Sequence, residues 1–506
     1  MIITAESDVP RLSSLSVQSL LPHDLKAVVF SSTLIACIII SGITALLLMC
    51  SSVLVHWFVI PVSVCGVLIG VDAIDWLRGR LDLYDLSGIL GILGVHFFFL
   101  APLLHVSWNF WLRVSAPPDW RDWLGYMAIL NLAGLILYRL CRQTLNNQKR
   151  LPKTYWEIQK SRFYLLAPLC IVIAIAMQIW TYAQFGGISG YMQSPVTNPA
   201  AFKGWGWIFM ISESAPILVT FFVIMHCQGR TIGWLRIASA LLLLFALQML
   251  FGGLRGSRSA TVLLLFWVVG CIHLLLRPVP KKLVLCGCIF LGAFMYFYRF
   301  YKSMGGDAVQ AFSGADKRQQ IAETTGRTSE FLILEDFGRA DVQAFILYRL
   351  IEDGRYFDYA RGRTYLGALS LLVPSWIMSE KPETKVKEGT EIQIGRGGYV
   401  PDESVSSRVY GLAGESMLNF GPISVPLAYA VLGFIVGWFR KSAGTLLRGD
   451  ARLLLVPFGV YVCVCVLMGD SDNLVFGVIK NGFLPLLVVL CSVKRISLLT
   501  SARTKP

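Results

Sequence analysis

Long apolar stretches recur along the chain, and their length indicates its architecture. A helix needs about 20 mostly apolar residues to cross a bilayer. Twelve segments reach or approach that length: 27–49, 52–71, 86–105, 123–140, 163–182, 206–227, 237–254, 259–276, 283–301, 415–439, 453–469 and 474–493. The first two run together, so we place a tight turn at Cys50-Ser51-Ser52. The pattern predicts an all-α polytopic membrane protein with about twelve transmembrane helices.

One long polar stretch interrupts this pattern. Residues 302–414 separate an N-terminal membrane domain of about nine helices (1–301) from a C-terminal membrane segment of about three (415–506). The other connections are short. A long insert between closely spaced helices usually carries function, so the loop is the first place to look for a site.

Within the loop, the sequence predicts two helices and a coil. Apolar residues recur every three or four positions over 329–352, which predicts an amphipathic helix that leaves Arg339 off its apolar stripe. The apolar stretch 366–377 is too short to span a bilayer and is typical of an interfacial or re-entrant helix. Residues 380–408 are polar and rich in glycine, which predicts a mobile coil.

The composition agrees with a membrane protein. Of 506 residues, 55% are hydrophobic and 15% are charged, whereas a soluble domain is about 25% charged. These values exclude a soluble enzyme, a disordered scaffold and a disulfide-stapled secreted module. A formal net charge of +14 would suggest a nucleic acid partner for a soluble protein. Here we expect no nucleic acid, and the location of the positive charge matters more than its total.

The basic residues indicate an orientation. The termini and one alternating set of short loops hold 24 Lys and Arg residues, and the opposite set holds six. Because basic loops stay in the cytoplasm, this predicts two cytoplasmic termini and an extracytoplasmic loop at 302–414. Loops longer than about 60 residues escape this rule, so the basic residues of the long loop do not contradict it.

The cysteines and histidines form no metal-binding pattern. All twelve cysteines lie in or beside apolar segments, and we interpret the two Cys-x-Cys pairs there as small apolar filler and not as metal ligands. No histidine lies in the long loop, which excludes a histidine base there, while one at a helix end such as His105 stays open. Asp470-Ser471-Asp472 resembles the metal motif of some glycosyltransferases, but three residues carry little weight. We therefore expect no metal and no cofactor.

Two arginines stand where charge is costly. Arg255 and Arg258 occupy a short glycine-containing turn between two predicted helices on the extracytoplasmic side. Two guanidiniums this close repel one another and are costly to desolvate. A bound phosphate relieves both costs through bidentate hydrogen bonds. The alternative is that both side chains reach out to lipid headgroups.

Two carboxylates are further candidates. Glu415 opens the predicted helix at 415–439, where it either caps the helix or serves as a general base or an organiser of the arginines. Glu213 lies inside a predicted span, where an ionisable residue is a candidate site by default.

Several short motifs occur in an order that resembles one family. They are Gly186-Gly187-Ile188, the turn at 253–258, Arg361-Gly362-Arg363-Thr364-Tyr365-Leu366, Pro374, Lys381-Pro382 and the stretch 414–421. This order, with many helices and one long loop in the C-terminal half, resembles the Wzy-type O-antigen polymerases. The resemblance covers most of the chain and is densest between residues 250 and 421.

The resemblance implies a fold, a reaction and partners. Such enzymes have a GT-C-like helical fold and work without a metal at the periplasmic face of the bacterial inner membrane. They transfer a growing glycan from undecaprenyl pyrophosphate onto a new undecaprenyl-pyrophosphate-linked repeat unit. The implied partners are these lipid-linked oligosaccharides, membrane lipids and a protein that regulates chain length.

The candidate residues fit that chemistry. Departure of a lipid diphosphate builds negative charge, which arginines must stabilise where no metal does. We expect Arg255 and Arg258 to bind the diphosphate with help from Arg339 and Arg408, and Glu415 to orient or deprotonate the acceptor hydroxyl. The residues expected to contact substrate are Arg299, Arg363, Tyr365, Lys381, Tyr399 and Asn419. Arginines locked in carboxylate pairs, with no cavity beneath them, would count against this site.

Other functions stay open at this point. An O-antigen ligase uses the same lipid donor and has a similar plan. A transporter of lipid-linked oligosaccharides also has about twelve helices, but its halves often show internal repeats, and its charges line the middle of the membrane. We find no such repeats. A structural membrane subunit without chemistry is the last alternative.

Overall fold

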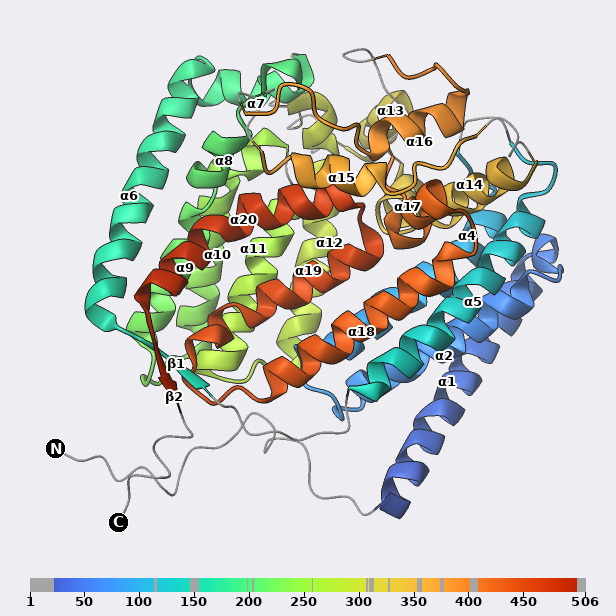
Figure 1. The fold of residues 1–506 in the computed structure, drawn as a ribbon, viewed down its shortest axis with the longest axis horizontal. Coiled ribbons are helices and arrows are strands. Elements are labelled where there is room, and N and C mark those ends of the chain that lie inside the picture. Colours follow the sequence, from blue (N-terminus) through green and yellow to red (C-terminus); the bar gives the residue numbers. More distant parts are fainter. Residues whose placement is uncertain are drawn as a thin grey trace.

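The computed structural model describes residues 22–497 apart from positions 113–115, 146–153, 198, 203, 257, 306, 307, 309–313, 326, 327, 353–356, 374–376 and 401–407. Nearly all regular structure in the described part is helical, which confirms an all-α protein (Figure 1). Both termini extend beyond these residues, so their predicted cytoplasmic location stays a prediction.

Among the described residues, ten helical segments are long and apolar enough to cross a membrane, which makes the chain a multi-pass membrane protein. They are α1 (Pro22–Cys50), α2 (Val59–Leu77), α3–α4 (Leu86–Ser107), α5 (Trp120–Thr144), α6 (Lys160–Gln184), α8–α9 (Gly206–Cys227), α10 (Trp234–Phe251), α11 with its last turn (Arg258–Leu276), α12 (Lys281–Met304) and α20 (Ser471–Ser492). α18 (Ser424–Gly444) and α19 (Val456–Met468) occupy the other two predicted segments. A total of twelve crossings stays a prediction.

The predicted turn between the first two spans is confirmed. α1 ends at Cys50, and a short 3-10 helix over Ser52–Leu54 leads into α2. The N–H of Ser51 still donates to the Leu47 carbonyl at 3.0 Å, which closes the last turn of α1. The chain therefore reverses at this polar break, as expected because the two joined apolar segments are too long for one crossing.

The long loop forms a helical cap at one end of the bundle (Figure 1). Its elements are α13 (Ala315–Thr325), a π-helical segment (Phe331–Asp336), α14 (Ala340–Glu352), α15 (Arg363–Ser370), α16 (Lys385–Ile394) and α17 (Gly411–Phe420). Apolar side chains of α14 and α17, such as Phe345 and Met417, join the same core as α2 and α5. We call this end of the molecule the capped end.

Two predictions within the loop are wrong in their boundaries. The helix predicted over 329–352 is interrupted between Asp336 and Ala340. The interruption includes Gly338, where an added Cβ would lie 2.3 Å from the Leu334 carbonyl oxygen, so that only glycine fits this tight passage.

The coil predicted over 380–408 contains α16, and its Ile392 is buried in the core. This helix is too short to give a clear apolar period, and the glycines around it favoured the prediction of a coil. The helix predicted over 366–377 begins earlier, at Arg363, and ends at Ser370. Positions 374–376 lie outside the described residues.

The predicted span over 415–439 is also wrong at its start. The chain forms two helices there, α17 and α18, which are separated at Gly421 with a φ of +81°. Glycine adopts this left-handed conformation without the steric cost that a Cβ causes, so it ends the first helix. Residue 415 therefore belongs to a separate helix of the capped end, and α17 continues across the predicted domain boundary at 414.

A two-stranded sheet joins two distant connections at the opposite end. β1 (Thr154–Ile158) pairs antiparallel with β2 (Val493–Ser497), and the Arg495 guanidinium lies 4.7 Å from the ring centroid of Trp156. The sheet places the segments after α5 and α20 together, away from the capped end (Figure 1). The distribution of basic residues predicted that the segments after α5 and α20 lie on the same side of the membrane. Their pairing in one sheet agrees with that prediction.

Candidate functional site

Two of the predicted arginines converge on a short segment, residues 335–339, which comprises the end of the π-helical segment and its connection to α14. Arg258, the first residue of α11, pairs with the Asp336 carboxylate. Arg408, which precedes α17, places its Nη1 2.5 Å from Oε2 of Glu335. Elements that are distant in the sequence thus bring two guanidiniums to the capped end, next to the start of a membrane span.

Arg339 belongs to the same segment and is held by backbone oxygens. Its Nη1 donates to the Asp336 carbonyl at 3.3 Å and also to the carbonyls of Glu335 and Gly338. Among the described residues, Nε of Arg339 and Nη1 of Arg258 are buried and have no hydrogen-bond partner. Leaving a buried donor unpaired is costly, so these two N–H groups would be satisfied by an acceptor that reaches the segment. Arg258 and Arg408 are nevertheless held in carboxylate pairs, an arrangement that counts against the predicted diphosphate site.

A buried histidine–carboxylate pair lies beside this segment. Nε2 of His105 is 3.7 Å from Oδ1 of Asp341, and both side chains are almost completely buried. Nδ1 of His105 lies 2.6 Å from the Phe110 carbonyl oxygen, which can only accept a hydrogen bond, so Nδ1 carries a proton. His105 is the histidine that the sequence left open at a helix end.

The protonation of the adjacent carboxyls is set mainly by burial. Burial and the charge of Asp341 raise the pKa of Glu335 to about 7, although the Arg408 guanidinium acts in the opposite direction. Burial also raises the pKa of Asp341. The Glu335 side chain is 11% exposed, so it is the member of the pair that solvent reaches.

Glu415 is held in the middle of α17, so the predicted role as cap of a membrane helix is wrong. Its carboxylate accepts hydrogen bonds from Oγ1 of Thr364 at 2.8 Å and from the N–H and Oγ of Ser471 at 2.6 and 2.5 Å. Burial and the charge of Asp470 raise its pKa to about 7, against these hydrogen bonds. With only 3% of its surface exposed, Glu415 connects α15, α17 and α20.

Asp470 caps α17, a role that the sequence offered to Glu415 for the helix predicted over 415–439. Its Oδ1 accepts the N–H groups of Tyr410 and Gly411, at 2.9 and 2.8 Å, where α17 begins. Its Oδ2 lies 2.6 Å from Nζ of Lys385, and both side chains are at most 2% exposed. The first aspartate of the Asp470-Ser471-Asp472 motif is therefore engaged with the protein itself.

Arg255 belongs to a different cluster, inside the membrane bundle. Its Nε lies 2.8 Å from Oε1 of Glu213, and its guanidinium lies 4.3 Å from the Phe209 ring centroid. Lys480 of α20 pairs with the same carboxylate. Arg255 and Arg258 thus each hold a carboxylate of their own, which relieves the charge cost without phosphate and counts against a joint diphosphate site.

Two of the predicted substrate contacts have structural roles. Asn419 is fully buried, donates to Oγ1 of Thr364 at 2.7 Å and accepts the Gly362 N–H at 2.9 Å. Tyr365 stacks on Phe420, with ring centroids 6.3 Å apart. Both residues therefore fix α15 against α17.

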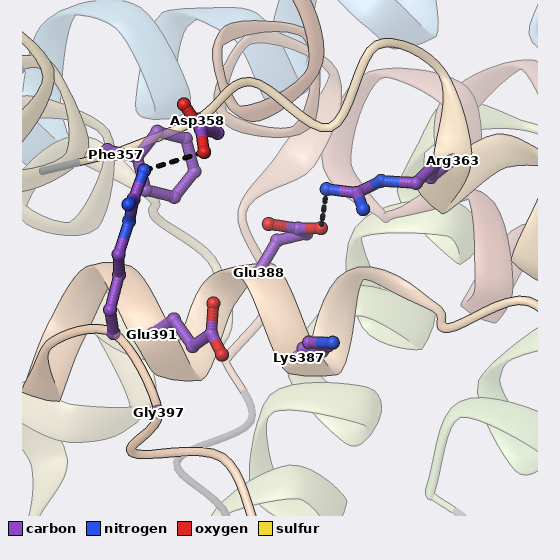
Figure 2. A pocket seen from close by; sticks show the side chains of 8 residues that line it. Phe357, Asp358, Arg363, Lys387, Glu388, Glu391 and Gly397 are labelled. Atoms are coloured by element: carbon purple, nitrogen blue, oxygen red, sulfur yellow. Dashed lines mark hydrogen bonds and ion pairs between the residues drawn. The ribbon is translucent and has the colours of Figure 1, made fainter.

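The other predicted contacts are spread over the capped end. Arg299 is buried between the Tyr296 and Phe300 rings, at 4.2 and 4.7 Å from their centroids. Arg363 lines an open pocket (Figure 2). Lys381 lies before α16 and Tyr399 lies after it.

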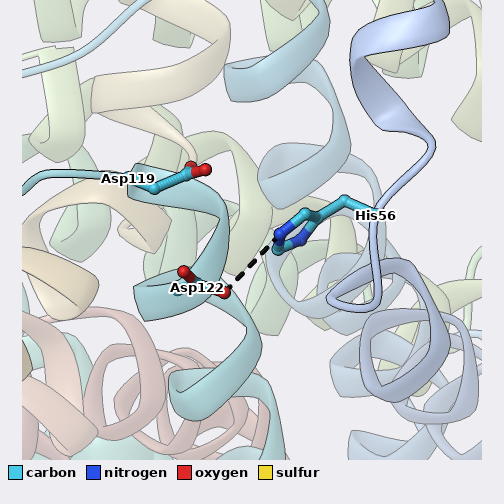
Figure 3. Close-up of side chains that lie close together, drawn as sticks. All are labelled: His56, Asp119 and Asp122. Atoms are coloured by element: carbon cyan, nitrogen blue, oxygen red, sulfur yellow. Dashed lines mark ion pairs between the residues drawn. The ribbon is translucent and has the colours of Figure 1, made fainter.

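One further cluster has the composition of a metal site. Donor atoms of His56, Asp119 and Asp122 lie within 4.8 Å of one another (Figure 3). Oδ1 of Asp122 accepts Nε1–H of Trp57 at 2.6 Å, and Oδ2 of Asp119 pairs with Arg121 at 2.7 Å. These partners account for both carboxylates, so the cluster ties the start of α5 to the turn before α2.

No protein-family model, no curated protein and no solved structure matches this chain.

Proposed function

We propose that this protein polymerises lipid-linked oligosaccharides at the periplasmic face of the bacterial inner membrane. It transfers a glycan from undecaprenyl pyrophosphate onto a new undecaprenyl-pyrophosphate-linked repeat unit. The observation that carries the proposal is the gathering of Arg258, Arg339 and Arg408 on residues 335–339, with two N–H donors still unpartnered. The reaction and its lipid-linked substrates are those that the resemblance to Wzy-type polymerases implies.

The arginines suit a leaving group that gains negative charge. Arg258 and Arg408 are each held by a single carboxylate, from Asp336 and Glu335. A diphosphate carries more charge and more acceptor oxygens than one carboxylate, so it competes for both guanidiniums. When Arg408 turns to the diphosphate, Glu335 loses its cation and becomes a stronger base.

The reaction also needs a proton acceptor. The acceptor hydroxyl oxygen bonds to the anomeric carbon, and the bond from that carbon to the diphosphate oxygen breaks with its electron pair. The hydroxyl proton then passes to a carboxylate. We assign this role to Glu335 because it is more exposed than Glu415, which takes the organising role.

Reconstitution tests the reaction directly. The full-length protein in lipid nanodiscs receives undecaprenyl-pyrophosphate-linked repeat units from its source strain as the only glycan substrate. A ladder of products that differ by one repeat unit is expected on a gel, and adding the regulator of chain length should narrow it. A ligase would leave these units single until a lipid A acceptor is added, and a transporter would leave them unchanged. Either result would refute the polymerase.

The polymerisation rate should fall with pH below about 7. Glu335, whose pKa is about 7, faces Arg408, Asp341 and His105. A base must be deprotonated, so activity is present above this pKa and decreases about tenfold per pH unit below it. Glu335→Gln should lower the rate by about 10²–10⁴-fold and flatten this acid limb. The measurement is the initial polymerisation rate at substrate concentrations well below KM, which reports the pKa of the free enzyme, over about two pH units on either side of 7.

Two variants separate this role from its alternatives. Glu323→Gln on α13, an exposed carboxylate, should keep the wild-type pH profile. Glu415→Gln should lower activity but keep the acid limb. If the limb disappears in Glu415→Gln and persists in Glu335→Gln, Glu415 is the base instead.

A further inference from the structure

An open pocket of about 320 Å³ lies on α16 at the capped end (Figure 2). Its volume is at the lower end of the range of about 300–1,000 Å³ for small-molecule sites. Three structural parts enclose it: the coil before α15, the start of α15, and α16 with the turn that follows. The lining residues are Phe357, Asp358, Arg363, Lys387, Glu388, Glu391, Arg396 and Gly397.

Ion pairs across the pocket hold its polar groups in place. Arg363 reaches Oε1 of Glu388 at 3.0 Å, and Arg396 reaches Oδ2 of Asp358 at 2.7 Å. In Figure 2, Glu388 and Glu391 rise from α16 toward the opposite wall that carries Arg363 and Asp358. The arginines and Asp358 are largely exposed, so their hydrogen-bonding groups are accessible to a ligand from solution.

The balanced charge of the pocket favours a neutral ligand over a diphosphate. Three carboxylates and three cationic groups line it, so it has no net positive charge. Two like unit charges 4 Å apart repel by about 4 kcal/mol at an effective dielectric constant of 20. A diphosphate in this pocket would meet that repulsion from more than one carboxylate, including the largely buried Glu388.

An uncharged, hydroxyl-rich ligand suits the same groups. Carboxylate oxygens accept from hydroxyls and guanidinium N–H groups donate to them, so a sugar ring finds both kinds of partner. The Phe357 ring adds an apolar surface against which the C–H face of a sugar can pack. A hydroxyl gains no charge on binding, so the ion pairs of Arg363 and Arg396 can persist beside it.

The pocket is connected to the proposed reaction site through α15. Arg363 lines the pocket, and the next residue, Thr364, donates to Glu415. On the other side, Nε of Arg349 on α14 donates to the Ile392 carbonyl of α16 at 3.2 Å. A ligand on α16 therefore lies beside α15, which contacts Glu415 of α17, and α16 itself contacts α14, which follows residues 335–339.

We propose that this pocket binds a neutral sugar of the glycan, at a position remote from the bond that reacts. The proposal rests on the proposed function for the identity of the glycan. It assigns recognition of the repeat unit to α16 and its surroundings, and diphosphate binding to the arginines on residues 335–339.

Binding of a lipid-free oligosaccharide tests the pocket. The probe is the repeat-unit oligosaccharide released by mild acid from the source strain's own lipid-linked precursor, which removes lipid and diphosphate. Isothermal titration of the full-length protein in nanodiscs measures its affinity. Glu391→Gln and Arg396→Gln should each weaken binding by about tenfold, since each replaces a charged hydrogen-bonding group with a neutral one. Arg121→Gln, an exposed ion-pair variant at the start of α5, should bind like the wild type.

The outcomes are distinct from those of the polymerisation assay. Unchanged affinity in both pocket variants overturns the pocket while leaving the polymerase intact. Displacement of the oligosaccharide by inorganic diphosphate overturns the assignment of a neutral sugar. If the wild-type protein makes no ladder but the pocket variants still lose affinity, the polymerase fails and the sugar site stands.

Discussion

Arg258→Gln should abolish visible polymer while the protein still folds and inserts. Arg258 contributes a charge-assisted donor where the departing diphosphate gains charge, and removal of one such donor costs about 10²–10³-fold in rate. Its present partner, Asp336, is partly exposed and tolerates the loss of its cation. The measurement is the ladder in the nanodisc assay. In cells, surface glycans should carry a single repeat unit.

Three companion variants sharpen this prediction. Arg258→Lys keeps the charge but loses the planar fork, so it should retain an intermediate rate. Arg121→Gln should behave as the wild type. Arg255→Gln should reduce stability more than chemistry, because it leaves Lys480 alone with Glu213 in the membrane bundle. Ladders of normal length in Arg258→Gln would remove this arginine from the site.

Asp470→Asn should destabilise the capped end by about 3–5 kcal/mol, the cost of breaking a buried ion pair. The substitution leaves the Lys385 ammonium buried without a counter-charge, since this side chain is only 2% exposed. It also weakens the cap of α17, where the carboxylate accepts two backbone N–H groups. Thermal unfolding in nanodiscs, followed by circular dichroism, measures the effect.

Matched variants identify the buried charge as the cause. Asp358→Asn, which breaks the exposed pair with Arg396 at the same end, should cost at most about 1 kcal/mol. The double variant Lys385→Met with Asp470→Asn should recover much of the lost stability, because no charge remains buried. An unfolding temperature for Asp470→Asn equal to that of the wild type would show that this pair does not hold the cap.

The candidate site was only partly predictable. Arg258, Arg339 and Arg408 stood out as arginines at a membrane edge or in a long loop, and the structure joins them through residues 335–339. Nothing in the sequence predicted that Arg255 would join Glu213 and Lys480 instead. Asp336 and Asp341 had only a weak signal, as carboxylates on either side of Arg339 in the loop.

The wrong helix boundaries share one cause. Apolar periodicity detects long helices, but α16 and α17 have only ten residues each, which is too few for a clear period. Glu415 appeared to cap a membrane helix because the left-handed turn at Gly421 has no unique sequence signature. Asp470, which does cap α17, lies 59 positions after Gly411.

The multi-pass helical architecture was determined by the sequence alone, since crossing a bilayer depends on the length and polarity of each segment by itself. The pairing of charges was decided only by the tertiary structure. Arg258 meets Asp336 across 78 positions, and Lys385 meets Asp470 across 85. Such pairs form because buried charges need partners wherever packing brings them together, and no local pattern records which partner that is.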